Sequence, residues 1–244
     1  MSALLVSACG FNEPKKLTII KENHDIEGGF LISSLIGQRL RQQNAGIVLI
    51  CCQQTFKYYD QCGKKLGYNL SMSLSKKCLD VIEPLRELLI LSQKKYSLVS
   101  LMDNIMSRVE QMIEENRKNI TIIVDNLEFF TNLDATEKDL IKFGTSLQEL
   151  SNKRDNISVV LKIGLCDYHH TLSNNLEDLA DVVLSVEKLQ SGDFWDVDGK
   201  LTIRKMNYKN EELINNLETE RSLLYFISDH NIKLSAPGEF GLKV

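Results

Sequence analysis

The amino-acid sequence predicts an α/β fold with a mostly parallel sheet flanked by helices and antiparallel strands near the C-terminus. Apolar runs alternate with longer segments of helical periodicity, and the last fifty residues change to short β-type segments. Nearly continuous apolar runs are typical of parallel strands that are covered on both faces. We expect six such strands, at Leu17–Ile20, Gly46–Cys52, Cys78–Ile82, Ile120–Asp125, Ile157–Gly164 and Asp181–Val186.

Two long helices are predicted from apolar residues at helical spacing. One stripe runs through residues 98–113 and a second through residues 136–150. A stripe of this kind packs on a sheet while the opposite face of the helix meets solvent. Both helices are therefore expected to cover the parallel sheet.

The C-terminal region predicts antiparallel strands. Phe194–Val197 and Leu201–Ile203 flank Asp198-Gly199, a dipeptide that favours a two-residue hairpin turn. Two further short strands are expected at Ser222–Ile227 and Ile232–Leu234. Residues 1–15 show no periodicity and are expected to form a loose arm. We therefore expect the arm at 1–15 and a single domain over 16–244, with residues 191–244 as its C-terminal β extension.

The segment that follows the first predicted strand has the layout of a phosphate-binding loop without its chemistry. In the motif G-x-x-x-x-G-K-[ST], glycine amides surround the phosphates, a lysine neutralises them and a hydroxyl holds Mg²⁺. Asn23 aligns with the first glycine, Gly28 with the second, Gly29 with the lysine and Phe30 with the hydroxyl residue. The sequence thus predicts a fold of the phosphate-loop NTPase type with a degenerate loop. One glycine pair at an ordinary strand-to-helix turn is the simpler alternative.

Catalytic groups for nucleotide hydrolysis are also missing from the predicted strand ends. Asp125 ends an apolar strand, where such NTPases place an acid that helps to hold Mg²⁺, and we interpret it as vestigial. Gln53 and Gln54 can orient a water molecule but cannot accept its proton, and Asp60 is expected on the following helix. We therefore expect no catalytic residues and no bound cofactor.

Composition excludes several other classes. The net charge is −4, which argues against an autonomous nucleic-acid binder, and no apolar run is long enough to span a bilayer. The six cysteines show no C-x-x-C spacing, and His169-His170 is an adjacent pair rather than a metal-binding spacing on one helix face. We expect reduced thiols, no metal site, no leader peptide, and a cytoplasmic or nuclear location.

Several short motifs then occur in a characteristic order. They are Lys16-Leu17-Thr18, Gly28-x-Phe30-Leu31, the block Gln54-x-Phe56-x-x-Tyr59-x-x-x-Gly63-x-Lys65-Leu66-Gly67, Val124-Asp125, and Asp196-Val197-Asp198-Gly199-x-Leu201. Their order and spacing resemble the sixth subunit of the Elongator complex over about residues 15–235. None of these motifs is a catalytic signature.

The resemblance implies a RecA-like fold without nucleotide motifs. It also implies assembly with the fourth and fifth Elongator subunits, two copies of each, into a hexameric ring. That ring binds tRNA and assists the catalytic subcomplex that modifies the uridine at the wobble position. The family is described as having no catalytic residues of its own, so the resemblance implies a scaffold without enzymatic activity, in the manner of a pseudo-ATPase.

Two loops are candidates for contact with RNA or a partner, on the expectation that loops after the inner strands face the opening of such a ring. They are Asp125–Asn132 and Asp167–Asn175, and the second contains His169 and His170. Two alternatives stay open. The first is a diverged ATPase that uses Asp125 and a partner's lysine. The second is a RecA-like recombination paralogue that acts on DNA.

Overall fold

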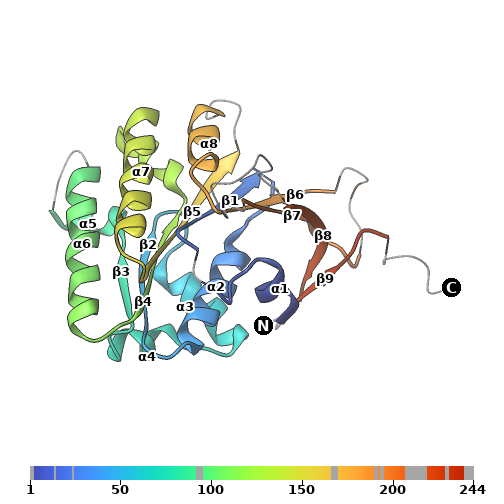
Figure 1. Cartoon of the computed structure of the whole chain (residues 1–244), viewed down its shortest axis with the longest axis horizontal. Helices are drawn as coiled ribbons and strands as arrows, with labels where there is room; N and C mark the ends of the chain where they lie inside the picture. Colours follow the sequence, from blue (N-terminus) through green and yellow to red (C-terminus); the bar gives the residue numbers. More distant parts are fainter. Residues whose placement is uncertain are drawn as a thin grey trace, which may run out of the picture.

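The computed structural model describes residues 3–13, 15–23, 25–91, 96–165, 170–189, 192, 195–206, 219–228 and 231–238, without the side chains of residues 91, 165 and 170. Within this part of the chain, one sheet has the strand order β3-β2-β4-β5-β1-β6-β7-β8-β9 (Figure 1). The strands are β1 (Leu17–Asn23), β2 (Ala45–Cys51), β3 (Leu79–Ile82), β4 (Asn119–Asp125), β5 (Ile157–Leu165), β6 (Val182–Glu187), β7 (Gly199–Lys205), β8 (Thr219–Ile227) and β9 (Ile232–Ser235).

The strands from β3 to β6 pair in parallel, and β7, β8 and β9 extend the sheet in antiparallel pairing. The predicted fold class and the six predicted parallel strands are confirmed. Strand β1 continues three residues beyond its predicted end at Ile20. This extension places Glu22 inside a strand rather than in a loop.

Helices cover both faces of the parallel region. On one face lie α1 (Ala3–Ala8), α2 (Gly29–Arg41), α3 (Phe56–Leu66) and α4 (Leu70–Ser75), which pack in one apolar cluster. On the other face lie α6 (Leu98–Glu114), the 3₁₀ helix η1 (Leu127–Leu133), α7 (Glu137–Lys153) and α8 (His170–Glu177). Helix α5 (Pro84–Leu91) follows the edge strand β3 (Figure 1).

The two predicted long helices are confirmed as α6 and α7, and local capping explains where each begins. The Ser97 side chain accepts a hydrogen bond from the Ser100 amide at the start of α6. At the start of α7, Thr136 and Asp139 form a reciprocal capping box. Each arrangement satisfies amides that have no partner within the helix.

The hairpin predicted around Asp198-Gly199 is wrong. Gly199 begins β7 and pairs with Tyr225 of β8, while the Asp198 carboxylate accepts a hydrogen bond from the Ile227 amide. A Cβ atom at Gly199 would lie 2.6 Å from the carbonyl oxygen of Glu187, so this glycine permits close strand packing rather than a turn. Phe194 lies outside the described residues.

The expectation of a loose N-terminal arm is wrong for residues 3–13. Leu5, Val6 and Phe11 are buried and join the apolar cluster beneath α2 and β8. The segment is too short to show helical periodicity, but its apolar side chains are covered once β7 to β9 extend the sheet beside it. In the part of the chain that the structure describes, no helix is long and apolar enough to cross a membrane.

Candidate functional site

The degenerate phosphate loop joins β1 to α2. Gly28 is the N-cap of α2, and its amide donates a hydrogen bond of 2.6 Å to Oε2 of Glu22. Glu22 is 5% exposed. The amino end of a helix attracts anions through its unpaired amides and its dipole. At this helix the anion is a carboxylate of the chain itself.

Gly28 is required by this close approach. A Cβ atom at Gly28 would lie 3.1 Å from Cγ2 of Ile20 and 3.4 Å from Oε2 of Glu22. The φ angle of Gly28 is −83°, so its role does not depend on a left-handed backbone. The glycine therefore admits an internal carboxylate where the intact motif admits a phosphate.

Lys162 of β5 lies between two acids, Glu22 and Asp125, of which only Asp125 belongs to the predicted site. Its Nζ atom is 3.1 Å from Oε1 of Glu22 on β1 and 2.9 Å from Oδ1 of Asp125 on β4. Strand β5 lies between β1 and β4, so a single long side chain reaches both neighbours. Lys162 is 1% exposed and Asp125 is fully buried. We call Glu22, Lys162 and Asp125 the buried ion triad.

Hydrogen bonds from the loop after β2 complete the surroundings of Asp125. The backbone amide of Gln54 donates a hydrogen bond to Oδ2 of Asp125 over 3.0 Å. The side-chain oxygen of Gln53 accepts a hydrogen bond from Lys162 over 2.9 Å. Asn126 also donates to the Gln53 side chain, over 2.8 Å. The acid that would help to hold a metal in an NTPase is thus engaged by an ammonium and an amide.

A third acidic group, Glu128 of η1, lies beside the triad. Its carboxylate accepts a hydrogen bond from the Gly164 backbone, and a Cβ atom at Gly164 would lie 2.6 Å from its Oε2. Burial raises the pKa of Glu128 to about 7; the hydrogen bond from Gly164 opposes this rise and the negative charge of Glu22 adds to it. Among the described residues, Oε1 of Glu128 has no hydrogen-bond partner.

The charge of this arrangement is unfavourable for a nucleotide. Glu22, Asp125 and Glu128 supply three carboxyl groups, while Lys162 supplies one ammonium that is already shared by two of them. A polyphosphate entering the loop would meet net negative charge and would have to displace Glu22 from the helix terminus. The geometry is that of an occupied anion site rather than an open one.

The remaining residues of the predicted loop have packing roles. Phe30, at the hydroxyl position of the motif, lies against Tyr225 with ring centroids 4.8 Å apart. Gly29 stands at the lysine position of the motif. A Cβ atom placed on it would lie 3.6 Å from the Tyr58 hydroxyl, which is an ordinary contact distance. Asp60 lies on α3 as expected and pairs with Lys64.

Both predicted contact loops contain helical residues, and their contact with RNA or a partner stays a prediction. Asp125–Asn132 is not an open loop, because Asp125 belongs to the triad and Leu127 and Phe130 of η1 are core residues. His169 lies outside the described residues. His170 begins α8, which is anchored by the Glu177 carboxylate to Lys21 over 2.5 Å and to Arg204 over 2.6 Å.

In the described ranges, no group of three or more His, Cys, Asp or Glu side chains is arranged so that it could hold a metal ion. Burial raises the pKa of the Cys9 thiol to about 12 and the pKa of Cys51 well above its usual range. Thiols of this kind are poor nucleophiles at neutral pH. Cys166 lies outside the described residues.

Comparison with known sequences decides the family. A sequence model of the family described as Elongation complex protein 6 matches residues 1–229. The chain belongs to the Elongation complex protein 6 family. Elongator complex protein 6 of Drosophila melanogaster is 34% identical over 258 aligned positions that cover all of both chains. The resemblance stated from the short motifs is thereby confirmed.

Solved structures establish the fold of this Elongator family member. Flagellar accessory protein FlaH from Methanocaldococcus jannaschii matches with a TM-score of 0.66 and 16% identity, covering 96% of this chain and 95% of its own. A KaiC-like protein from Pyrococcus horikoshii matches with a TM-score of 0.61 and 10% identity, covering 91% and 90%. The Elongator subunit therefore has the RecA-like fold, with a mostly parallel sheet and C-terminal antiparallel strands.

The motif comparison missed Glu22 and Lys162, which define the site of this Elongator subunit. A signal was present in the sequence, because Lys162 interrupts the apolar run Val159-Val160-Leu161-Lys162-Ile163. A lysine inside a strand covered on both faces requires a buried partner. Strand alternation places Glu22, Lys162 and Asp125 on the α2 face, but their convergence required the strand order.

Proposed function

We propose that this chain is a catalytically silent RecA-like scaffold subunit of the Elongator accessory ring. In this proposal the ring contains two copies each of this chain and of the fourth and fifth Elongator subunits. It presents tRNA to the catalytic subcomplex that modifies the wobble uridine, in the cytoplasm or the nucleus. Family membership and fold support an Elongator accessory subunit. The catalytic silence is our inference from the site, and the ring, the tRNA and the wobble uridine enter the proposal from the family resemblance.

The buried ion triad is the observation that carries the proposal. Glu22 takes the place of a phosphate at the amino end of α2, and Lys162 takes the place of a cation beside Asp125. In a phosphate-loop ATPase these loops contact the bound phosphates and Mg²⁺, whereas here they are joined by side chains of the protein. A subunit built in this way supplies shape to an assembly without a hydrolysis cycle.

The diverged ATPase is the main alternative. It would need Asp125 to leave Lys162 and a partner's lysine to enter a site that already holds three carboxyl groups. Separating one member of a buried ion pair from its partner costs about 3–5 kcal/mol. The burial of Asp125 therefore favours the silent subunit.

The DNA-acting recombination paralogue is disfavoured because such paralogues usually keep the phosphate-loop lysine, where this chain has Gly29.

The assembly part of the proposal is tested by native mass spectrometry of the tagged chain purified from its own cells. We expect a particle that holds two copies of this chain and two copies each of two other RecA-like subunits. Recovery of the chain alone, or together with DNA-repair proteins, would contradict the proposal.

A further inference from the structure

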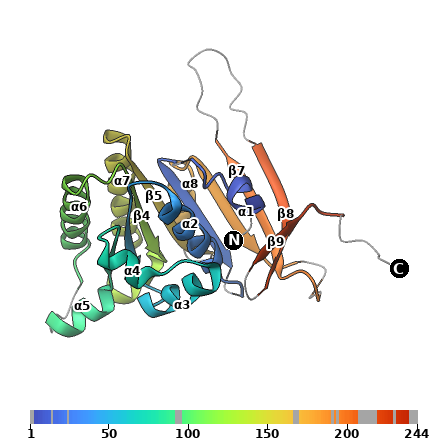
Figure 2. The same cartoon turned by 90° about the horizontal axis from the view of Figure 1, so that it is seen from below.

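A hollow of about 490 Å³ lies between α1 and the antiparallel end of the sheet, far from the buried ion triad. Helix α1 lies against β9 at this end, while α5 and α6 lie at the opposite end of the molecule (Figure 2). Its walls combine apolar side chains, including Leu223 and Leu234, with the cationic side chains of Lys205 and Arg221. No Asp or Glu side chain among the described residues lines it.

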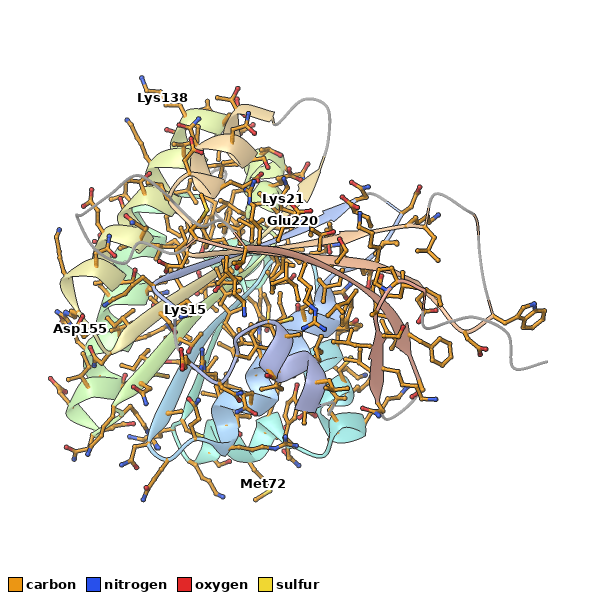
Figure 3. All side chains as sticks on the ribbon, turned by 45° about the vertical axis from the view of Figure 1, so that its right-hand side comes forward. Lys15, Lys21, Met72, Lys138, Asp155 and Glu220 are labelled. Atoms are coloured by element: carbon orange, nitrogen blue, oxygen red, sulfur yellow. The ribbon has the colours of Figure 1, made fainter. Side chains whose placement is uncertain are left out.

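The two cations of the hollow have no carboxylate partner among the described residues. Neither Lys205 nor Arg221 forms an ion pair with any residue in the described part of the chain. Glu220, next to Arg221 in sequence, lies on the other side of the sheet from α1 (Figure 3). The hydroxyl of Ser235, which also lines the hollow, is closed to solvent and has no hydrogen-bond partner among the described residues.

The rim of the hollow is apolar and ends at a strand edge. Leu4 of α1 is 67% exposed although it lines the hollow. Strand β9 pairs only with β8 among the described strands, so its outer edge offers backbone hydrogen bonds. An unpaired strand edge beside a hollow is a site at which an extended segment of another chain can add to a sheet.

We infer that the hollow and the β9 edge together bind an extended segment of another Elongator subunit that carries both apolar and acidic side chains. The inference rests on the proposed function, which supplies neighbouring subunits. Apolar side chains of the segment would cover Leu4 and Leu234, and its carboxylates would pair with Arg221 and Lys205. An RNA strand fits less well, because phosphates would use the two cations but leave the apolar walls exposed.

Of the two cations, Arg221 is the better one to replace, because its substitution disturbs less of the surrounding packing. It is exposed, whereas Lys205 also lies 3.7 Å from the position of a Cβ on Gly10 at the end of α1 and so contributes to local packing. Lys138 on α7 is the matched control, since it is exposed and lies away from α1 (Figure 3). Arg221→Gln removes the charge with less risk to folding than Arg221→Glu.

The experiment places the photo-crosslinking amino acid benzoylphenylalanine at position 4 of the full-length chain in its own cells. The crosslinked peptide is then identified by mass spectrometry in the purified complex. We expect a peptide of another subunit that contains both acidic and apolar residues. Arg221→Glu should lower this crosslink about tenfold and Arg221→Gln less, while Lys138→Glu should leave it unchanged. Replacing the partner's carboxylate with lysine should restore the crosslink in the Arg221→Glu chain.

Other results would overturn the inference. They are a crosslink to residues 207–218 or 239–244 of the same chain, a crosslink to RNA, no crosslink, or a crosslink that is insensitive to Arg221→Glu. These failures differ from failure of the proposed function, in which the unmodified chain would purify without Elongator subunits.

Discussion

The ammonium of Lys162 lies 2.9 Å from the carboxylate of Asp125, and both groups are closed to solvent at the carboxyl ends of adjacent strands. In a RecA-like ATPase this end of the sheet receives the nucleotide and its metal. Here the same Lys162 also reaches Glu22, whose carboxylate accepts a hydrogen bond from the amide of Gly28, the N-cap of α2. The chain thus provides its own anion and its own cation.

Lys162→Met should destabilise the chain by about 3–5 kcal/mol, because it leaves Glu22 and Asp125 buried without their cation. Lys138→Met, on the exposed face of α7, should change stability by no more than about 0.5 kcal/mol. Urea denaturation followed by circular dichroism measures both variants. Equal effects of the two substitutions would show that the triad contributes nothing particular.

Gly28→Ala and Gly29→Ala should differ although the residues are neighbours. A methyl group at position 28 meets Ile20 and Glu22 at 3.1 and 3.4 Å, so we expect a loss of about 1–3 kcal/mol. A methyl group at position 29 has an ordinary contact with Tyr58 at 3.6 Å, and we expect less than about 1 kcal/mol in either direction. Thermal melts of the pair decide the matter, and a larger loss at position 29 would contradict the loop geometry.

Glu128 should make stability depend on pH between about 4.5 and 7. Its pKa in the folded chain, about 7, lies above the ordinary value of 4.5, so the folded state holds the proton more tightly than the unfolded state. The contribution of this group is complete below pH 4.5 and is lost as the pH rises through 7. Glu128→Gln keeps the shape without the charge.

The measurement for Glu128 is the free energy of unfolding of both chains at several pH values. The Glu128→Gln chain should gain stability relative to the natural chain as the pH rises from 5 to 8, by an amount on the order of 1 kcal/mol. A difference that is constant across this range would argue against the raised pKa.

Joint replacement of His169 and His170 by alanine should weaken tRNA binding by the assembled ring without dissolving it. The prediction follows from the expected position of their loop at the ring opening, and α8 is anchored through Glu177 independently of these side chains. Filter binding of tRNA to the purified ring measures the effect. Unchanged affinity with an intact ring would remove both residues from the RNA-contacting surface.

Local patterns were sufficient to predict much of this fold. The strands from β1 to β6 were predicted because each is an apolar run bounded by turn residues, and α6 and α7 because their stripes span several turns. The N-terminal helix was missed because it is only six residues long. Gly199 was assigned to a hairpin turn because its actual role, close contact with Glu187 and Tyr225, depends on strands distant in sequence.

The site was predicted in outline only. Gly28 and Asp125 were identified because they occupy motif positions, and the lost lysine and hydroxyl were evident from Gly29 and Phe30. The groups that replace them were not found, since no motif contains an acid at position 22 or a lysine at position 162. Their meeting depends on β5 lying between β1 and β4, which is a property of the strand order and not of local sequence.

Photolabelling of the purified complex with 8-azido-ATP in the presence of Mg²⁺ tests most directly whether the buried ion triad takes the place of a nucleotide. The label on each subunit is measured separately, with an intact phosphate-loop ATPase labelled in parallel as the positive control. We predict that excess ATP does not reduce the label on this chain, so that any label found there is nonspecific. Saturable label on this chain that ATP displaces would show that the site binds nucleotide and would contradict the account.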